Sequence, residues 1–103
     1  MADIVQQAQG TVAQELLDAL KHQERRRILK QVVESGRPVS PSMASKELPA
    51  PLRSTSKHFR ALADAGLIVL TTEVPIRGAT QHFYLPAEDL LTHPIVQAVL
   101  MCM

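Results

Sequence analysis

Three basic side chains in the middle of the chain recur at the spacing of a helix. Arg53, Lys57 and Arg60 stand at positions i, i+4 and i+7, so a helix places them in one stripe. Two hydroxyl side chains, Ser54 and Ser56, flank the N-terminal end of this stripe. In the major groove of DNA, Arg and Lys donate hydrogen bonds to guanine edges, whereas hydroxyls suit phosphate oxygens. The stripe is therefore a candidate for DNA recognition, although a solvated helix face has the same composition.

The elements before the stripe help to decide between these two interpretations. We expect the helix that carries the stripe to span about residues 51–65 and to end before Gly66. Its expected inward positions are Leu52, Thr55, Phe59, Leu62 and Ala63. A short helix over about residues 41–48 precedes it, because Ser40 is a favourable N-cap and Pro41 a favourable first helical residue. A proline-containing turn separates the two helices.

The residues after Gly66 change from helical to strand patterning. Two runs rich in β-forming residues, 67–72 and 80–85, flank a turn that contains Arg77. We therefore expect a β-hairpin, the wing, over about residues 67–85. A short helix, a turn, a second helix and a hairpin, in this order, is how a winged helix-turn-helix presents its reading helix.

Further helices are expected on both sides of this unit. One begins at Val12, a second spans about residues 24–35, and a C-terminal helix spans about residues 87–101, where Pro94 bends or restarts the chain. Their apolar faces are Leu16, Leu17 and Leu20 in the first helix and Ile95, Val96 and Val99 in the last. Each face suits either the core of one chain or a dimer interface.

The expected fold is mostly α with a small β-hairpin (α+β), in the order helix-helix-helix-helix-hairpin-helix. At 103 residues the chain is long enough for one domain, which we expect over residues 12–103 after a flexible segment, 1–11. Cys102 is the single cysteine, so one chain forms no disulfide. With no signal sequence and no apolar run of about 18 residues, we expect a soluble cytoplasmic protein without a membrane partner.

The charge of the chain is sorted along its length. The net charge is only +1, but residues 21–60 contain ten basic and three acidic side chains, a net of +7, and the segments on either side carry −3 each. A concentration of positive charge in the middle of the chain favours an anionic partner.

Catalytic and metal-binding patterns are not visible in the sequence. It contains no glycine-rich phosphate loop, no nucleophile elbow and no paired carboxylates, so we expect neither an enzyme nor a cofactor. Asp89 and His93 are four residues apart, but a second histidine-containing half of a metal site is missing downstream. A carboxylate at a helix start and a solvent-facing histidine explain this pair without a metal.

Two motifs resemble the arsenic-repressor-type (ArsR-type) winged helix regulators. The run LKHQERRRIL over residues 20–29 is similar to the opening of that family, and SKHFRALADAGLI over residues 56–68 is similar to its recognition helix. The wing, with Arg77-Gly78 and then Phe83-Tyr84-Leu85, also resembles the family, and the likeness covers about residues 13–85. Residues 40–48 lack the Cys-x-Cys pair of the metal-sensing relatives.

The resemblance implies a role for particular residues. It implies DNA contacts at Arg53, Ser54, Ser56, Lys57 and Arg60, a contact with the DNA backbone or minor groove at Arg77, and a homodimer formed through the first and last helices. His58 matches a histidine of the family, for which a bridge to the body of the domain is as good an account as a DNA contact.

Together these features predict a transcriptional regulator that binds double-stranded DNA in a sequence-specific way. We expect a repressor that occupies a short palindromic operator as a homodimer; no inducer can be named. The alternative is a winged-helix protein-interaction module that does not bind specific DNA, and a further alternative is a DNA-binding adaptor without an inducer. Binding to phosphates should weaken steeply with salt, which separates DNA binding from protein interaction.

Overall fold

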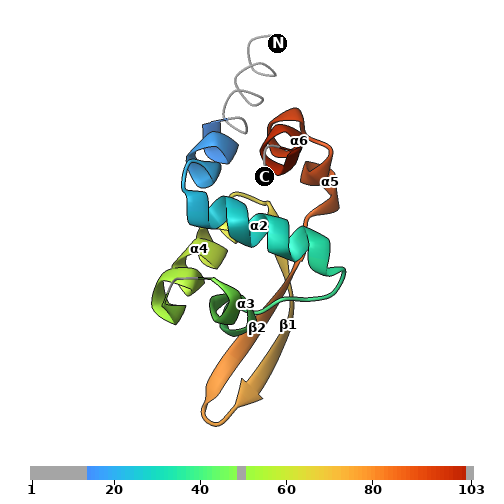
Figure 1. Cartoon of the computed structure of the whole chain (residues 1–103). Coiled ribbons are helices and arrows are strands. Elements are labelled where there is room, and N and C mark those ends of the chain that lie inside the picture. Colours follow the sequence, from blue (N-terminus) through green and yellow to red (C-terminus); the bar gives the residue numbers. More distant parts are fainter. Residues whose placement is uncertain (1–13, 49–50, 102–103) are drawn as a thin grey trace.

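The computed structural model describes residues 14–48 and 51–101. Residues 14–20 are helical, and the elements that follow are α2 (Gln23–Ser35), α3 (Pro41–Glu47), α4 (Leu52–Asp64), β1 (Ile68–Ile76), β2 (Ala79–Pro86), α5 (Glu88–Leu91) and α6 (Pro94–Met101). Helix α2 crosses the middle of the molecule, with α3, α4 and the wing on one side and residues 14–20, α5 and α6 on the other (Figure 1). The prediction of a mostly helical winged helix-turn-helix is confirmed.

The segment expected to be flexible, 1–11, and Cys102 lie outside the described residues. Within residues 14–48 and 51–101, no helix is long and apolar enough to cross a membrane.

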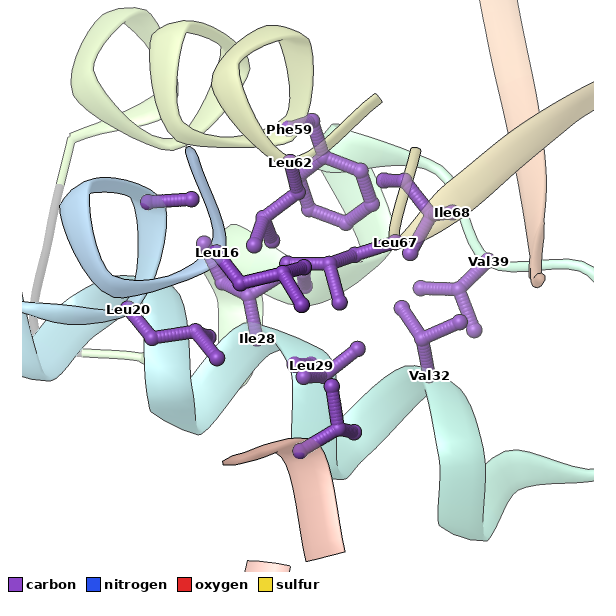
Figure 2. Packing of buried hydrophobic residues seen from close by; sticks show 13 residues of the cluster. Leu16, Leu20, Ile28, Leu29, Val32, Val39, Phe59, Leu62, Leu67 and Ile68 are labelled. Atoms are coloured by element: carbon purple, nitrogen blue, oxygen red, sulfur yellow. The ribbon is translucent and has the colours of Figure 1, made fainter. Parts of the chain in front are cut away.

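One hydrophobic core holds the helices and the base of the wing together. Phe59 and Leu62 of α4 point toward Ile28 and Leu29 of α2, and Leu67 closes the cluster from the start of the wing (Figure 2). All five side chains are at most 1% exposed. Burying one such side chain contributes about 1.5–3 kcal/mol. This core fixes the orientation of α4 relative to the rest of the domain.

Part of the predicted dimer interface belongs to this core instead. Leu16, Leu20 and Val96 are 0%, 4% and 0% exposed in the single chain, because residues 14–20 and α6 both pack against it. A second chain cannot contact these three side chains, so their assignment to a dimer interface is corrected here. Of the other residues proposed for that interface, Leu17 is 52% exposed. Ile95 and Val99 are half-buried at the edge of the core.

The short helix α3 begins as the sequence predicts. The Ser40 hydroxyl accepts a hydrogen bond from the Met43 amide at 3.2 Å, and Pro41 occupies the first helical position. Capping by a serine satisfies an amide that would otherwise lack a partner in the helix. The start of α3, and with it the angle at which the chain turns toward α4, is thereby set by local sequence.

The wing lies where the sequence predicts it, but its strands are longer than the two predicted runs. β1 and β2 pair in an antiparallel sheet from Ile68 opposite Pro86 to Ile76 opposite Ala79, with an irregularity between Leu70 and Thr72. Pro75, which lies between the two predicted runs and is therefore expected in the turn, lies in β1 instead. A proline is accepted there because β1 is the edge strand of a two-stranded sheet, where an amide that faces outward is not needed for pairing.

The turn of the wing consists of two residues in the left-handed region. Arg77 has φ 51° and Gly78 has φ 81°. Two successive residues with positive φ define the hairpin turn whose twist matches that of the strands it joins. Glycine adopts this conformation at no steric cost, whereas arginine does so with strain.

The C-terminal region consists of two short helices rather than one. α5 ends at Leu91 and α6 begins at Pro94, which restarts the helix because proline suits a first helical position. The Nδ1 atom of His93 accepts a hydrogen bond from the Ile95 amide at 3.2 Å, so this histidine stabilises the start of α6.

Candidate nucleic-acid interface

Helix α4 has one buried face and one exposed, basic face. Thr55, Phe59 and Leu62 are buried at 0% exposure, and they recur every three to four residues. The hydroxyl of Thr55 donates to the Pro51 carbonyl at 3.1 Å, which satisfies this buried polar group. The opposite face, which carries the basic stripe Arg53, Lys57 and Arg60, is exposed to solvent.

The side chains of the basic stripe are available to a partner. Within the described part of the chain, Arg53, Lys57 and Arg60 form neither an ion pair nor a side-chain hydrogen bond. Each therefore presents an unneutralised positive charge to the surroundings. Ser54 and Ser56 are half-buried beside the stripe.

A groove separates the start of α4 from the wing. Ser40 and Ser42 lie on the α3 side, Leu52 and Ser56 on α4, and the strand ends around Ile76, Ala79 and Thr80 form the other side. Its lining is mostly hydroxyl and apolar. The exposed Arg77 lies at the tip of the wing, next to Ile76, so the wing carries one basic side chain beyond the groove.

The wing and α4 are tied to each other through Tyr84. The Tyr84 ring packs against Phe59 with 5.4 Å between centroids and a tilt of 48°, a favourable geometry for aromatic rings. The Tyr84 backbone exchanges two hydrogen bonds of 2.9 Å with Val39, just before α3. Burial raises the pKa of the Tyr84 hydroxyl. Through Tyr84, β2 is thus connected both to α4 and to the residue just before α3.

The three consecutive arginines of α2 are half-buried and form contacts within the domain. Arg26 donates to the Leu20 carbonyl at 2.7 Å and Arg27 pairs with Glu24 at 3.4 Å. Arg25 donates from Nε to His58 at 3.2 Å. The contacts of Arg26 and Arg25 join α2 to residues 14–20 and to α4, whereas the pair Arg27–Glu24 lies within α2. The sequence did not reveal this division of the basic residues, because charge counting does not distinguish a charge that is paired from one that is exposed.

His58 bridges α4 to the body of the domain. Its Nδ1 atom accepts the hydrogen bond from Arg25, and its ring lies 6.0 Å from that of His22. Burial, followed by the positive charge of Arg25, lowers the pKa of His58. A neutral imidazole is the form that can accept this bond. Of the two accounts that the sequence allows for His58, these contacts support the structural one.

Leu52 is a residue for which the sequence prediction is wrong. It was expected to point inward, yet it is 50% exposed at the first position of α4. The buried face of α4 begins one turn later, at Thr55, because the first turn extends past the core. The helical pattern alone places Leu52 and Thr55 on the same side and cannot show where packing ends.

A metal site is not formed by the residues that the structure describes: no three side chains of His, Cys, Asp or Glu among them lie together. His93 uses its Nδ1 atom at the start of α6, which gives this histidine a structural role.

Comparisons with known proteins agree on the fold. A family model described as a helix-turn-helix domain matches residues 20–71. Reduced HlyU from Vibrio cholerae N16961 is similar at a TM-score of 0.68 and 19% identity, covering 93% of this chain and 90% of that chain. The transcriptional repressor BigR from Xylella fastidiosa is similar at a TM-score of 0.63 and 16% identity, covering 96% of this chain and 86% of that chain. Among curated proteins, no match is found.

The family match and the fold identify a DNA-binding regulator of the winged helix-turn-helix class. The family match covers half of the chain, and the chain therefore belongs to the helix-turn-helix domain family. This membership agrees with the prediction that the chain is not an enzyme.

Proposed function

We propose that the chain is a transcriptional repressor of the ArsR type, which binds a short inverted repeat in double-stranded DNA as a homodimer in the cytoplasm. The observation that carries this proposal is the basic stripe, three exposed cations on the outer face of a helix whose inner face is fixed in the core. The description of BigR as a transcriptional repressor supports repression as the outcome. Residues 12–103 act as a single domain in this proposal.

Each proposed contact follows from position and chemistry. Arg53, Lys57 and Arg60 enter the major groove on α4, where they bind guanine edges or neighbouring phosphates. Ser54 and Ser56 donate to phosphates at the start of the helix. Arg77 reaches the backbone or the minor groove from the tip of the wing. In this proposal, α4 supplies the sequence specificity and the wing adds affinity.

The proposed dimer forms at the end of the molecule opposite the wing. Residues 14–20 and α6 lie together at that end (Figure 1), and two large apolar side chains there are exposed, Leu17 at 52% and Met101 at 83%. We propose that Leu17, Ile95 and Val99 form the contact. Binding to two half-sites about one helical turn apart requires that this contact direct both copies of α4 toward one side of the dimer.

A selection from a random DNA library tests this function. The full-length protein is incubated with random duplexes, bound duplexes are sequenced over several rounds, and the enriched sequence is measured by fluorescence anisotropy in a salt series. The expected result is an inverted repeat whose affinity falls log-linearly with salt, by counterion release. No enrichment, together with salt-insensitive binding, would refute the proposal and favour the protein-interaction module.

A further inference from the structure

Leu52 stands out among the residues of the candidate interface because it is large, apolar and half-exposed. Its exposure is 50%, and it occupies the first position of α4, immediately before Arg53 of the basic stripe. Ser56 lies one helical turn further on the same side. An exposed leucine is common on protein surfaces and by itself needs no explanation. Its position at the leading end of the proposed reading helix gives this one a specific environment on DNA.

The apolar character of the groove extends to the wing. Leu52 and Ser56 line one side, while Ile76, itself 42% exposed, and Ala79 lie on the side of the wing. A DNA strand held between α4 and the wing brings its base edges against Leu52. The neighbours of Leu52 are the hydroxyl side chains of the groove and the cation of Arg53, so Leu52 is the residue of the first turn of α4 that offers an apolar surface.

The major groove of DNA presents one apolar group that a leucine can recognise, the C5-methyl group of thymine. Cytosine carries only a hydrogen at this position, and guanine and adenine present the N7 acceptor at the major-groove edge instead of a methyl group. Leu52 therefore has an apolar contact with thymine that the other bases do not offer.

We propose that Leu52 is a specificity-determining residue, which contacts the C5-methyl group of a thymine in each half-site of the operator. This inference rests on the proposed function, since it requires α4 to enter the major groove. It adds a base preference that the basic stripe does not supply, because Arg53, Lys57 and Arg60 recognise guanine and phosphate.

Deoxyuridine in place of thymidine tests the contact directly, because it removes the methyl group and keeps every hydrogen-bonding atom. The enriched duplex from the selection is prepared with each thymine of the half-site replaced in turn, and the wild-type affinity is measured by anisotropy. Burying one methyl contributes about a fourfold gain in affinity. At one position of the half-site, replacement of thymidine by deoxyuridine should therefore lower the affinity about fourfold. Replacement in both half-sites should lower it about 15-fold.

Two protein variants assign this effect to Leu52. Leu52→Ala should bind the thymine and deoxyuridine duplexes equally, and its own selection should lose the base preference at that position. Leu70→Ala is the matched control, since Leu70 is also exposed, at 43%, but lies on β1 near the base of the wing. It should retain the full sensitivity to deoxyuridine.

Each result has a defined meaning. An enriched repeat whose affinity is unaffected by deoxyuridine at every position, or a sensitivity that persists in Leu52→Ala, would overturn this inference and leave the proposed function intact. A library that yields no enriched repeat would overturn the proposed function and this inference with it. Because the deoxyuridine series uses wild-type protein, the first test does not depend on the folding of a variant.

Discussion

Removal of a single cation from the basic stripe should change the salt dependence of DNA binding by a calculable amount. Lys57 lies at the centre of the stripe, is exposed, and forms no ion pair with another described residue. Each phosphate that a protein neutralises contributes about 0.9 to the slope of log K against log salt. A homodimer carries Lys57 twice, so Lys57→Ala should reduce the magnitude of this slope by about 1.8.

This change is large enough to measure. Between about 50 and about 200 mM salt, a slope that is lower by about 1.8 makes the loss of affinity about 12-fold smaller than for the wild type. Fluorescence anisotropy of the enriched duplex, titrated at five or more salt concentrations within this range, gives the slope for each protein. Circular dichroism checks that the helix content of the variant is unchanged.

Lys21→Ala is the matched control for this measurement. Lys21 is also exposed and its removal changes the net charge equally, but it lies at the junction between residues 14–20 and α2, outside the basic stripe. Its slope should equal that of the wild type. An unchanged slope for Lys57→Ala would refute the assignment of α4 as the reading helix. An equal reduction for Lys21→Ala would mean that net charge, and not the stripe, governs binding.

Three further outcomes follow from the structure. Leu17→Asp should convert the proposed dimer to a folded monomer in sedimentation velocity, because Leu17 is 52% exposed in the single chain and its replacement leaves the core intact. The control Val69→Asp, at a residue on β1 that is 50% exposed, should remain dimeric. A dimer that survives Leu17→Asp would place the interface elsewhere. The pKa of His58 is lowered by burial and, to a smaller extent, by the charge of Arg25. As the pH drops below 6.5, the ordinary pKa of histidine, the unfolded chain therefore binds a proton at His58 before the folded chain does, and the free energy of unfolding should fall. His58→Gln keeps a hydrogen-bond acceptor without titrating, so urea unfolding at about pH 7.5 and about pH 5.5 should show a smaller loss of stability for this variant, and equal losses would contradict the assignment. Arg77→Asn should raise the free energy of unfolding by about 0.5–1 kcal/mol, because asparagine tolerates the positive φ of 51° better than arginine. It should also weaken DNA binding, because asparagine carries no charge. A loss of stability in urea would contradict this account of the turn.

Local sequence signals predicted the elements of the fold well. Ser40 and Pro41 mark the start of α3, and the structure has a serine cap and a proline at the positions expected. Gly66, expected to end α4, has φ 80° just after the last helical turn. These residues act through backbone conformation and short-range hydrogen bonds, which a sequence determines without knowledge of the rest of the fold.

Features that depend on packing were less predictable. Leu16 and Leu17 are adjacent apolar residues, yet one is 0% and the other 52% exposed, and periodicity gave both to the same face. Similarly, the role of Arg25 depends on His58, which lies 33 residues away and carries no sequence signal for this contact. The division of the basic residues between core contacts and the candidate interface appears only when α2, α4 and residues 14–20 are assembled.

In the wing, strand β1 is buried only at its base, so a small tilt there moves the tip over a long distance. β1 is buried only at its first residue, Ile68, and the remaining positions are exposed or half-buried to the tip. From Ile68 to Ile76 the strand extends about 27 Å, so a tilt of about 10° at the base displaces the tip by about 5 Å. That displacement is comparable to the width of the minor groove, about 6 Å. If α4 enters the major groove as proposed, a tilt of this size allows Arg77 to reach grooves of different width while Tyr84 keeps the base of the hairpin against α4.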